Sequence, residues 1–542
     1  MKQWKRYKSY ILPYKSAFIL GPLMMVTEVL GEILLPKFMS MIINHGVAQK
    51  DGGYILKMGL VMAITSFLMA AGGILGAYFA AKASISFTSD LRRDLFARVQ
   101  QFSFKNIDTF STGSLVTRLT NDIQQVQNLI MMGLRMMLRA PGMFLGALVM
   151  AFWMNAELAA VILVVIPLLT AAIVWILRTA YPRFTAMQKA LDTLNSGIQE
   201  VLTNVRVVKS FVREDYEEKR FADTNRELKE AGLRALKIVI ATMPVMMFAM
   251  NVTTLAVVWF GGNLIIGGRM AVGDLTAFTT YIVQILMSLM MLSMVFLQSS
   301  RAFASGRRIN EVMDTQVSLT DDHAAYPEAV VKSGKIEFQN VSFRYYKDSA
   351  EKVLDQINLT IEPGQMIGII GSTGCGKTTL INLLLRFYDI DAGRIMVDGR
   401  SSRDYTRASL RRAFGMVLQD TWLFEGTVAE NIAYGCPDAT REQVIEAAKR
   451  AHAHKFIVQL PGGYDTVIGE DGGTFSQGQK QLLCIARVML TDPAILLLDE
   501  ATSSIDTRTE LQVQAAFDEL MAGRTSFVVA HRLSTIRNAD CI

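Results

Sequence analysis

The sequence predicts two domains of different fold class: an α-helical membrane domain of six transmembrane helices with long cytoplasmic extensions, and an α/β domain built around a phosphate-binding loop. Three observations lead to this prediction. Of the 542 residues, 51% are apolar and the mean hydropathy is +0.28, values typical of chains that contain membrane spans. A glycine-rich loop lies at 371–378. Strands and helices alternate around that loop, as they do in α/β domains.

The membrane domain is expected at residues 1–310, where six stretches are long and apolar enough to cross a bilayer. The third stretch is short, and it is expected to be the outer end of a helix that begins near Ser114. The segments after the second and fourth spans keep helical periodicity, so the membrane helices should continue beyond the bilayer. The six stretches lie at 17–43, 54–81, 140–154, 158–177, 238–266 and 275–303.

Basic residues set the expected orientation. They gather in the two long segments between spans, whereas the short connections carry few of them. The positive-inside rule therefore places the N-terminus, both long segments and the α/β domain in the cytoplasm. The net charge of +6 and the pI of about 9.0 are interpreted in the same way, and no nucleic-acid partner is expected. The four cysteines show no metal-ligand spacing and are expected to be reduced thiols.

Each long segment has a compact tip. The first loop tip comprises residues 102–110 and the second comprises residues 211–216. Such tips could dock on a cytoplasmic domain and carry motion to the membrane helices. The alternative is that each is the solvated end of a helical hairpin.

Four charged side chains lie inside the predicted spans. Glu28 and Glu32 are four residues apart, as are Arg135 and Arg139, so each pair shares a helix face. Counted from the outer ends of their spans, Glu28 and Arg139 both lie about 24 Å deep at 1.5 Å per residue. Charges at that depth face a cavity or a partner. They line or brace a central polar cavity, form a structural ion pair, or extend their charged ends to the membrane interface. Many of the 31 methionines also lie in the spans, where flexible thioethers suit either promiscuous apolar surfaces or ordinary packing.

The α/β domain begins after a change in composition. Residues 311–333 are polar and predict a linker, and the domain is expected to occupy 334–542. The chain stops as a further strand begins, so the domain is expected to continue beyond Ile542.

The phosphate-binding loop lies between a predicted buried strand at 365–370 and a predicted helix at 379–385. Glycines let backbone N–H groups close on a polyphosphate, and the helix N-terminus adds its positive dipole end. Lys377 is placed to meet the β- and γ-phosphates, and the hydroxyl of Thr378 to bind Mg²⁺. The nucleotide-binding residues assigned to this segment are Gly371, Ser372, Thr373, Gly374, Cys375, Gly376, Lys377, Thr378 and Thr379.

A second motif is the apolar run at 494–498 that ends in Asp499 and Glu500. A continuous apolar run predicts a central parallel strand, and the carboxyl ends of such strands bind ligands. Asp499 is expected to hold Mg²⁺, and Glu500 to polarise the attacking water as a general base.

Together these motifs resemble those of ABC exporter half-transporters, in which six membrane helices are fused to one ATP-binding domain. The resemblance covers nearly the whole chain. It implies that Tyr345 stacks on adenine and that the Q-loop residue Gln419 senses Mg²⁺. It also implies that Asp506 belongs to the D-loop and that His531 contacts the γ-phosphate. In such proteins two chains sandwich two ATP molecules, each between one phosphate loop and the partner's signature sequence.

The signature sequence departs from the family pattern L-S-G-G-Q. It reads Phe475-Ser476-Gln477-Gly478-Gln479. Ser476 and Gly478 can still contact a γ-phosphate across the dimer, but Gln477 replaces a glycine where close backbone approach is expected. An altered signature beside an intact Lys377 and Glu500 resembles one member of a heterodimeric exporter with one weakened ATP site. A homodimer that tolerates the variant is the alternative.

The resemblance implies ATP-driven export of a small amphipathic or hydrophobic substrate (a drug, lipid or peptide), with ATP and Mg²⁺ as cofactors. The implied partners are a second half-transporter chain and membrane lipid, and the expected location is a bacterial plasma membrane. Two alternatives remain open: an ABC-like protein in which ATP gates a channel or a sensor, and a homodimeric lipid flippase. Six spans exclude a soluble ATPase of the same sheet fold.

Overall fold

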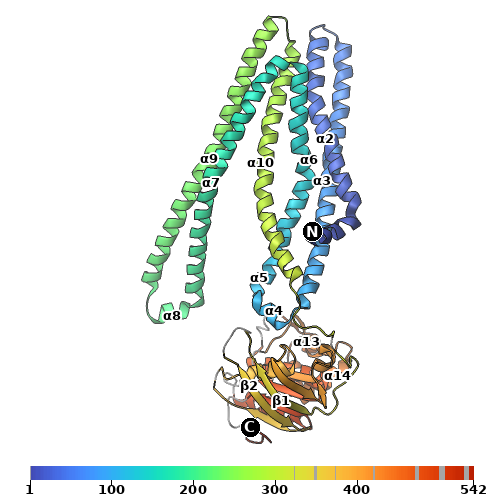
Figure 1. The fold of residues 1–542 in the computed structure, drawn as a ribbon, viewed down its shortest axis with the longest axis vertical. Helices are drawn as coiled ribbons and strands as arrows, with labels where there is room; N and C mark the ends of the chain where they lie inside the picture. The colour runs from blue at the N-terminus through green and yellow to red at the C-terminus, as the bar shows by residue number, and fades with distance from the viewer. Residues whose placement is uncertain are drawn as a thin grey trace. The chain divides into compact units, whose positions relative to one another are not determined.

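A computed structural model gives the fold of the chain (Figure 1). The chain forms two compact units. The helical unit comprises Met1–Gln100 and Thr112–Thr315, and the α/β unit comprises Gln101–Ser111 and Gln316–Ile542. The structure describes residues 2–322, 324–346, 351–372, 374–418, 421–469, 475–499, 507–529 and 536–542.

The helices of the helical unit are far longer than a bilayer requires. Helices α3, α7 and α9 contain 49, 48 and 53 residues, whereas about 20 residues cross a membrane. The elements of this unit are α1 (Lys2–Ile11), η1 (Leu12–Tyr14), α2 (Lys15–Met41), η2 (Ile42–Val47), α3 (Gly52–Gln100), α5 (Thr112–Thr117), η3 (Arg118–Asp122), α6 (Ile123–Met154), α7 (Ala156–Thr203), α8 (Val205–Ser210), α9 (Glu214–Ile266) and α10 (Val272–Asp314).

The prediction of six spans is confirmed. Within the described residues, six helices are long and apolar enough to cross a membrane. The third is the outer part of a helical segment that runs from Thr112 to Met154, as expected, with the π-helical turn η3 inside it. The prediction that the helices continue past their apolar parts is also confirmed. Helix α10 continues to Asp314, so residues 311–314 are helical and not part of a linker. The reason is that Ile309 and Val312 share a buried helix face.

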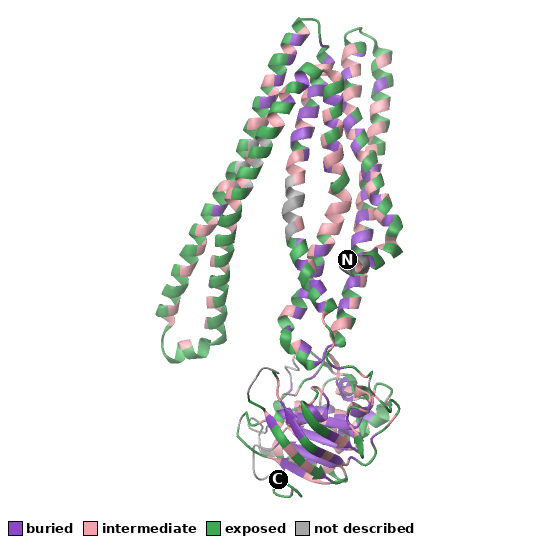
Figure 2. Ribbon diagram, in the orientation of Figure 1, coloured by how far each residue is buried: buried purple, intermediate pink, exposed green. Residues whose placement is uncertain are grey.

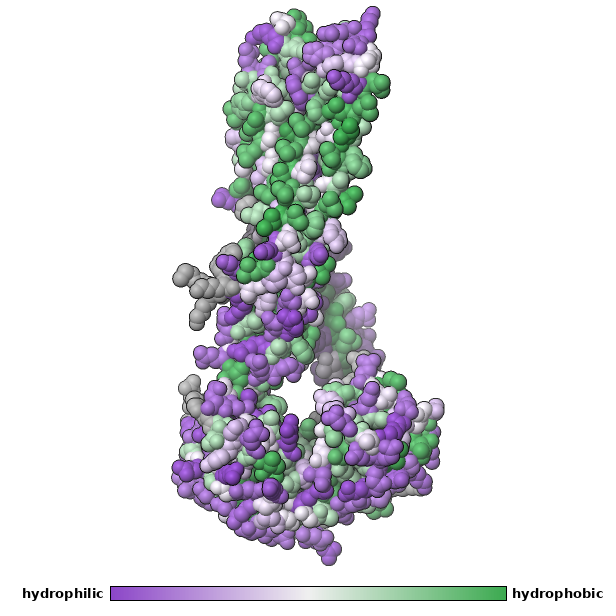
Figure 3. Space-filling view, turned by 90° about the vertical axis from the view of Figure 1, so that its right-hand side faces the viewer, coloured by the Kyte–Doolittle hydropathy of each residue, from purple (hydrophilic) through white to green (hydrophobic). Residues whose placement is uncertain are grey.

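The helices pack in two groups (Figure 1). Helices α2, α3, α6 and α10 form one bundle, and α7 and α9 run side by side as a pair. The closest approach of α2 to α3 depends on Gly72, since a Cβ there would lie 2.9 Å from the carbonyl oxygen of Met24. Large apolar side chains such as Phe67 and Trp175 remain exposed on the outside. Figure 3 shows apolar side chains gathered over the middle of this unit, the surface a spanning protein would present to lipid.

The α/β unit contains two larger sheets whose inward residues are buried (Figure 2). One is parallel, in the order β3-β10-β9-β6, and the other is antiparallel, in the order β2-β1-β4-β5. A short pair, β7-β8, completes the described strands. The strands are β1 (Ile336–Phe343), β2 (Leu354–Ile361), β3 (Met366–Ile369), β4 (Ala392–Val397), β5 (Arg400–Ser401), β6 (Phe414–Val417), β7 (Gly426–Thr427), β8 (Val467–Ile468), β9 (Ile495–Asp499) and β10 (Thr525–Val529).

Helices cover the parallel sheet and supply the rest of this unit's core. The apolar strands β9 and β10 lie at the centre of that sheet, where Leu496, Leu497 and Phe527 are fully buried. The fold class predicted from the sequence, a helical membrane domain followed by an α/β domain, is therefore confirmed. The helices and helical turns are α4 (Phe104–Thr109), α11 (Lys377–Leu384), α12 (Arg407–Arg412), α13 (Val428–Ala433), α14 (Arg441–Arg450), α15 (His454–Ile457), η4 (Gly463–Asp465), α16 (Gln477–Thr491) and α17 (Thr507–Met521).

One carboxylate secures the start of the α/β unit. Asp398, which follows β4, accepts hydrogen bonds from the backbone N–H groups of Lys332, Ser333 and Lys335 at 2.7, 2.9 and 2.9 Å. Burial by itself would raise the pKa of Asp398, but these hydrogen bonds and one from the Ser333 hydroxyl outweigh it, and the pKa lies below its usual value.

We expect Asp398→Asn to lower the free energy of unfolding of the α/β unit by about 1–3 kcal/mol at pH 7, because three backbone N–H groups lose a charged acceptor. The folded-state pKa is depressed, so this stability is present above about pH 3.9, the unfolded value. It is lost as pH falls through the folded pKa. Thermal unfolding of the full chain in detergent at pH 7 and at acid pH measures the difference. Asp518→Asn, at an exposed carboxylate on α17, is the control; equal effects of the two substitutions would contradict the assignment.

Candidate active site

The phosphate-binding loop connects β3 to α11. Gly376 precedes the first residue of α11 with φ of 100°, and Gly374 has φ of 87°. Residues other than glycine rarely adopt this left-handed conformation. A Cβ at Gly376 would also lie 3.2 Å from the carbonyl oxygen of Val353. The glycines therefore set the sharp turn that points the N–H groups at the start of α11 toward the loop, an arrangement that favours anions.

Lys377 lies across this loop. Its Nζ donates to the carbonyl oxygens of Gly371 and Ser372, both at 2.9 Å. The ammonium is therefore held inside the curve of the loop, and a phosphate bound there would meet this charge directly. Thr378, the predicted Mg²⁺ ligand, is exposed at the start of α11.

Thr379 has a different environment from its neighbour. Its side chain is buried, and its hydroxyl lies 3.0 Å from the hydroxyl of Tyr345. Tyr345 also meets the rings of Phe343 and Tyr388 edge to face, with centroids 5.0 and 5.1 Å apart. Thr379 and the two rings thus hold Tyr345 in place, which is the support an adenine-stacking side chain requires.

Asp499 ends β9 at the same edge of the sheet as the phosphate loop. Val529 on β10 pairs with Asp499 on one side and with Ile369, the last residue of β3, on the other. Neighbouring strands are about 4.8 Å apart, so the ends of β3 and β9 lie roughly 10 Å from each other. The other predicted residues of this site lie outside the described residues and remain predictions: Thr373, Gln419, Glu500, Asp506 and His531.

The signature sequence forms the start of α16. Ser476 caps the helix: its hydroxyl accepts from the N–H of Gln479 at 3.3 Å, and the side chain of Gln479 accepts from the N–H of Ser476 at 3.0 Å. This reciprocal pair is a capping box, and the spacing S-x-x-Q was present in the sequence. Gln477 donates from Nε2 to the hydroxyl of Thr421 at 3.2 Å, so its side chain is directed toward the end of the Q-loop segment.

The first loop tip docks on the α/β unit, as one of the two sequence-based hypotheses expected. Residues 101–111 belong to this unit although the chain on either side belongs to the helical unit. The ring of Phe104 lies 4.3 Å from that of Phe387. The hydroxyl of Tyr388 donates to Asp108 at 2.8 Å, and Asn106 donates to the carbonyl oxygen of Gln316 at 3.1 Å.

Tyr388 is the functional residue that sequence reasoning missed. It touches both Asp108 of the first loop tip and the ring of Tyr345. Burial and the hydrogen bond to Asp108 raise its pKa. No local pattern marks this tyrosine, because its two neighbours are 280 and 43 positions away. The second loop tip differs, since Phe211 and Val212 are 73% and 80% exposed.

The charged residues of the spans form a triad within the helical unit. Arg139 on α6 lies 3.2 Å from Glu28 and 3.0 Å from Glu32, both on α2. Arg139 therefore forms structural ion pairs with Glu28 and Glu32, which was one of the alternatives predicted from the sequence. Arg135, one turn earlier on α6, is not part of the triad.

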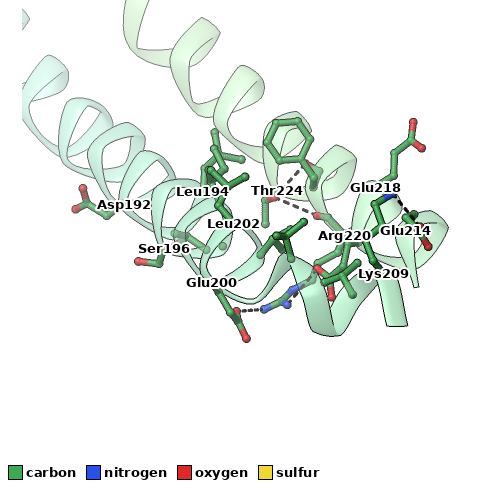
Figure 4. A pocket seen from close by; sticks show the side chains of 18 of the residues that line it. Asp192, Leu194, Ser196, Glu200, Leu202, Lys209, Glu214, Glu218, Arg220 and Thr224 are labelled. Atoms are coloured by element: carbon green, nitrogen blue, oxygen red, sulfur yellow. Dashed lines mark hydrogen bonds and ion pairs between the residues drawn. The ribbon is translucent and has the colours of Figure 1, made fainter. Parts of the chain in front are cut away.

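A cavity of about 830 Å³ lies between α7 and α9, near the turn that joins them (Figure 4). Its walls are mostly apolar, with Leu194, Leu202 and Phe221 among them. Ion pairs at its rim join Arg220 to Glu200 and Lys209 to Glu214. The cavity contains none of the residues assigned to nucleotide binding, and its lining suits helix packing more than catalysis.

Comparisons with known proteins match both units. The family model for the ABC transporter transmembrane region matches residues 18–289, and a second model, for the ABC transporter family, matches residues 354–503. The chain is 38% identical to an uncharacterized ABC transporter ATP-binding protein of Bacillus subtilis, YfiB, over 98% of this chain and 92% of that protein. It is 39% identical to a fatty acid ABC transporter ATP-binding/permease protein of Mycobacterium tuberculosis, over 83% of this chain and 71% of that protein.

Substitutions at Tyr388 separate its hydrogen bond to Asp108 from its ring contact with Tyr345. Tyr388→Phe keeps the ring against Tyr345 but removes the donor to Asp108. We therefore expect faster backbone hydrogen exchange in residues 102–110 with little change in ATP affinity. Tyr388→Ala removes both contacts, so it should also weaken ATP binding several-fold. Hydrogen–deuterium exchange and a fluorescent ATP analogue measure the two effects, with Tyr434→Phe as the control. Unchanged exchange in Tyr388→Phe would show that this hydrogen bond does not hold the tip.

Proposed function

The chain belongs to the ABC transporter family, with the membrane region and the ATPase domain in one polypeptide, and on this premise we propose that it exports a small amphipathic or hydrophobic substrate by alternating access. It is an ATPase coupled to transport, and the resemblance drawn from its motifs is confirmed. The observation that carries the proposal is the docking of α4 on the α/β unit. Because α4 lies between α3 and α5 in the chain, a movement of the ATPase domain that shifts α4 must displace long membrane helices.

ATP binding is assigned to the phosphate loop, Tyr345 and the partner's signature sequence. Lys377 already places its ammonium inside the loop, where it would bind the β- and γ-phosphates. The hydroxyl of Thr378 and the carboxylate of Asp499 are the hard oxygen ligands that suit Mg²⁺. When bound, Mg²⁺ neutralises the negative charge that develops on the phosphates. Glu500 would take the proton of the attacking water, and His531 would contact the γ-phosphate.

We propose that the active form is a dimer, with a heterodimer favoured. Two features support a second chain. The exposed apolar residues of the second loop tip, Phe211 and Val212, have the character of a contact surface. Ser476 and Gly478 begin a helix whose N-terminus can face a partner's ATP. The side chain of Gln477 turns toward Thr421 and donates a hydrogen bond to its hydroxyl. The Cβ of Gln477 would still leave less room than a glycine for a phosphate to reach the backbone of the signature sequence.

The family membership also supports a proposal for the substrate class and the location. The Mycobacterium tuberculosis relative is named a fatty acid transporter, so single-chain lipids are a candidate class. The basic residues of the long segments support a plasma-membrane orientation with the N-terminus and the ATPase domain in the cytoplasm.

Inside-out membrane vesicles test the direction and the energy source. We expect ATP-dependent uptake of a labelled fatty acid against its gradient, and its loss in Glu500→Gln. That variant should bind ATP normally but hydrolyse it at least about 100-fold more slowly, because it lacks the general base. Flux that runs only down a gradient and needs ATP binding alone would favour a gated channel over an exporter. Uptake that persists in Glu500→Gln would contradict the assignment of this residue.

ATPase measurements on the purified chain test the dimer. Alone, the chain should hydrolyse ATP slowly and without cooperativity, and a half-transporter copurified from native membranes should restore turnover. Gln477→Gly should raise the turnover of the isolated chain, since it restores the close approach expected of the signature. Thr491→Ser, at the exposed far end of the same helix, is the control and should leave turnover unchanged. Fast, cooperative and Glu500-dependent turnover by the isolated chain would establish a homodimer instead.

A further inference from the structure

Two arginines of the same helix have opposite environments within the helical unit. Arg139 is held by both carboxylates of the triad, and the exposed fractions of the Arg139, Glu28 and Glu32 side chains are 22%, 15% and 24%. Glu28 and Glu32, the two acidic residues in the span of α2, are thereby paired with one guanidinium. If Arg135 served to neutralise these carboxylates, it would be expected to contact one of them.

Arg135 instead has no ion pair within the described part of the chain, and its Nε is buried without a hydrogen-bond partner. It lies 20 residues from Asn155, the residue at the outer end of α6. At 1.5 Å per residue this is a depth of about 30 Å, the inner edge of the hydrocarbon core. A guanidinium in this position is costly unless it meets water or an anion.

Arg135 also lines a cavity. The cavity measures about 250 Å³ and lies along one face of α6. Three methionines, Met131, Met132 and Met136, line it together with Leu129, and Asn128 and Gln125 lie at its inner end. Methionine side chains adapt to apolar ligands of varied shape, because they have several rotatable bonds and a polarisable sulfur. The cavity therefore combines one positive charge with an adaptable apolar wall.

We propose that this cavity binds an amphipathic anion during export: its carboxylate or phosphate head pairs with Arg135, and its apolar part contacts Met131, Met132 and Met136. The planar guanidinium matches either head group with two parallel hydrogen bonds. The inference rests on the proposed export function and adds the charge of the substrate and the place where it binds. Arg139 differs in that its two Nη atoms are paired with Glu28 and Glu32, although its Nε, like that of Arg135, has no hydrogen-bond partner within the described residues.

Equilibrium binding to the full chain in phosphatidylcholine nanodiscs tests the charge. The probes share a sixteen-carbon tail and differ in head group: palmitate, hexadecyl phosphate, hexadecanol and hexadecyltrimethylammonium. We expect the two anions to bind saturably, and Arg135→Gln to weaken both about tenfold or more. Hexadecanol should change less than twofold, and Arg135→Lys should retain part of the anion affinity. Arg178→Gln, an exposed arginine on α7, is the matched control and should leave all binding unchanged.

A second variant tests the apolar wall. Met132→Gln keeps the charge but removes apolar contact, so it should weaken hexadecanol and palmitate alike, about fivefold. Arg135→Gln, by contrast, should spare hexadecanol. Helix content and thermal unfolding establish that each variant is folded. Replacing phosphatidylcholine by phosphatidylglycerol identifies the source of the head group. If phosphatidylglycerol competes with palmitate, and this competition disappears in Arg135→Gln, the ligand is a membrane lipid. If phosphatidylglycerol does not compete with palmitate, the ligand is a free single-chain acid.

The inference is overturned if folded Arg135→Gln binds palmitate within twofold of the unsubstituted chain, or if the cationic probe binds as tightly as the anions. Export and the site can be judged separately. If ATP-dependent and Glu500-dependent uptake persists in the same preparation, only the anion site is wrong. If that uptake is absent while palmitate binding depends on Arg135, the site stands and the proposed export is wrong.

Discussion

The docking of the first loop tip on the α/β unit is the contact on which the proposed coupling of ATP hydrolysis to export depends. A tip of eleven residues, Gln101–Ser111, leaves the helical unit and packs in the other unit. Its anchors are the ring of Phe104 against Phe387 and the carboxylate of Asp108 bonded to Tyr388. The chain continues from both ends of the tip into helices of the bundle. Under the proposed function, a movement of the ATPase domain would reach the membrane helices through this tip.

The same anchor contacts Tyr345, the residue proposed to stack on adenine. Tyr388 meets Tyr345 at 5.1 Å between ring centroids, and Tyr345 bonds to Thr379 on the helix that follows the phosphate loop. A ligand that repositions Tyr345 therefore changes the packing of Tyr388, which also holds Asp108. Packed aromatic rings have few alternative arrangements. If Tyr345 stacks on adenine as proposed, two side chains, Tyr345 and Tyr388, connect the bound nucleotide to Asp108 of the tip.

The sequence predicted the elements better than their contacts. The spans and the strands around the phosphate loop follow from apolar runs and glycine spacing, and both are local properties. Residues 311–314 were assigned to the linker because most of them are polar, but they continue α10, whose Ile309 and Val312 share a buried face. The spacing S-x-x-Q in the signature sequence also encodes a helix cap, so Gln479 has a structural role beside the nucleotide-binding role that the family resemblance implies. Arg135 and Arg139 have the same spacing and chemistry, and only the packing of α2 against α6 distinguishes the paired residue from the unpaired one.

A proline in α2 accounts for a hydrogen bond between α10 and α2, close to the place where α2 packs against α6. Pro36 lies inside α2 and has no N–H, so the carbonyl oxygen of Glu32 lacks its normal helical donor. Gln284 of α10 supplies a donor at 2.9 Å, and Tyr281 of α10 bonds the next carbonyl, that of Ile33, at 2.8 Å. In lipid an unsatisfied carbonyl is costly, so these bonds stabilise the packing of α10 on α2, while Arg139 joins α6 to α2. Three helices are therefore linked by polar contacts at this level. Arg135 lies one turn closer to the start of α6 than Arg139, so the cavity that it lines begins just beyond these contacts.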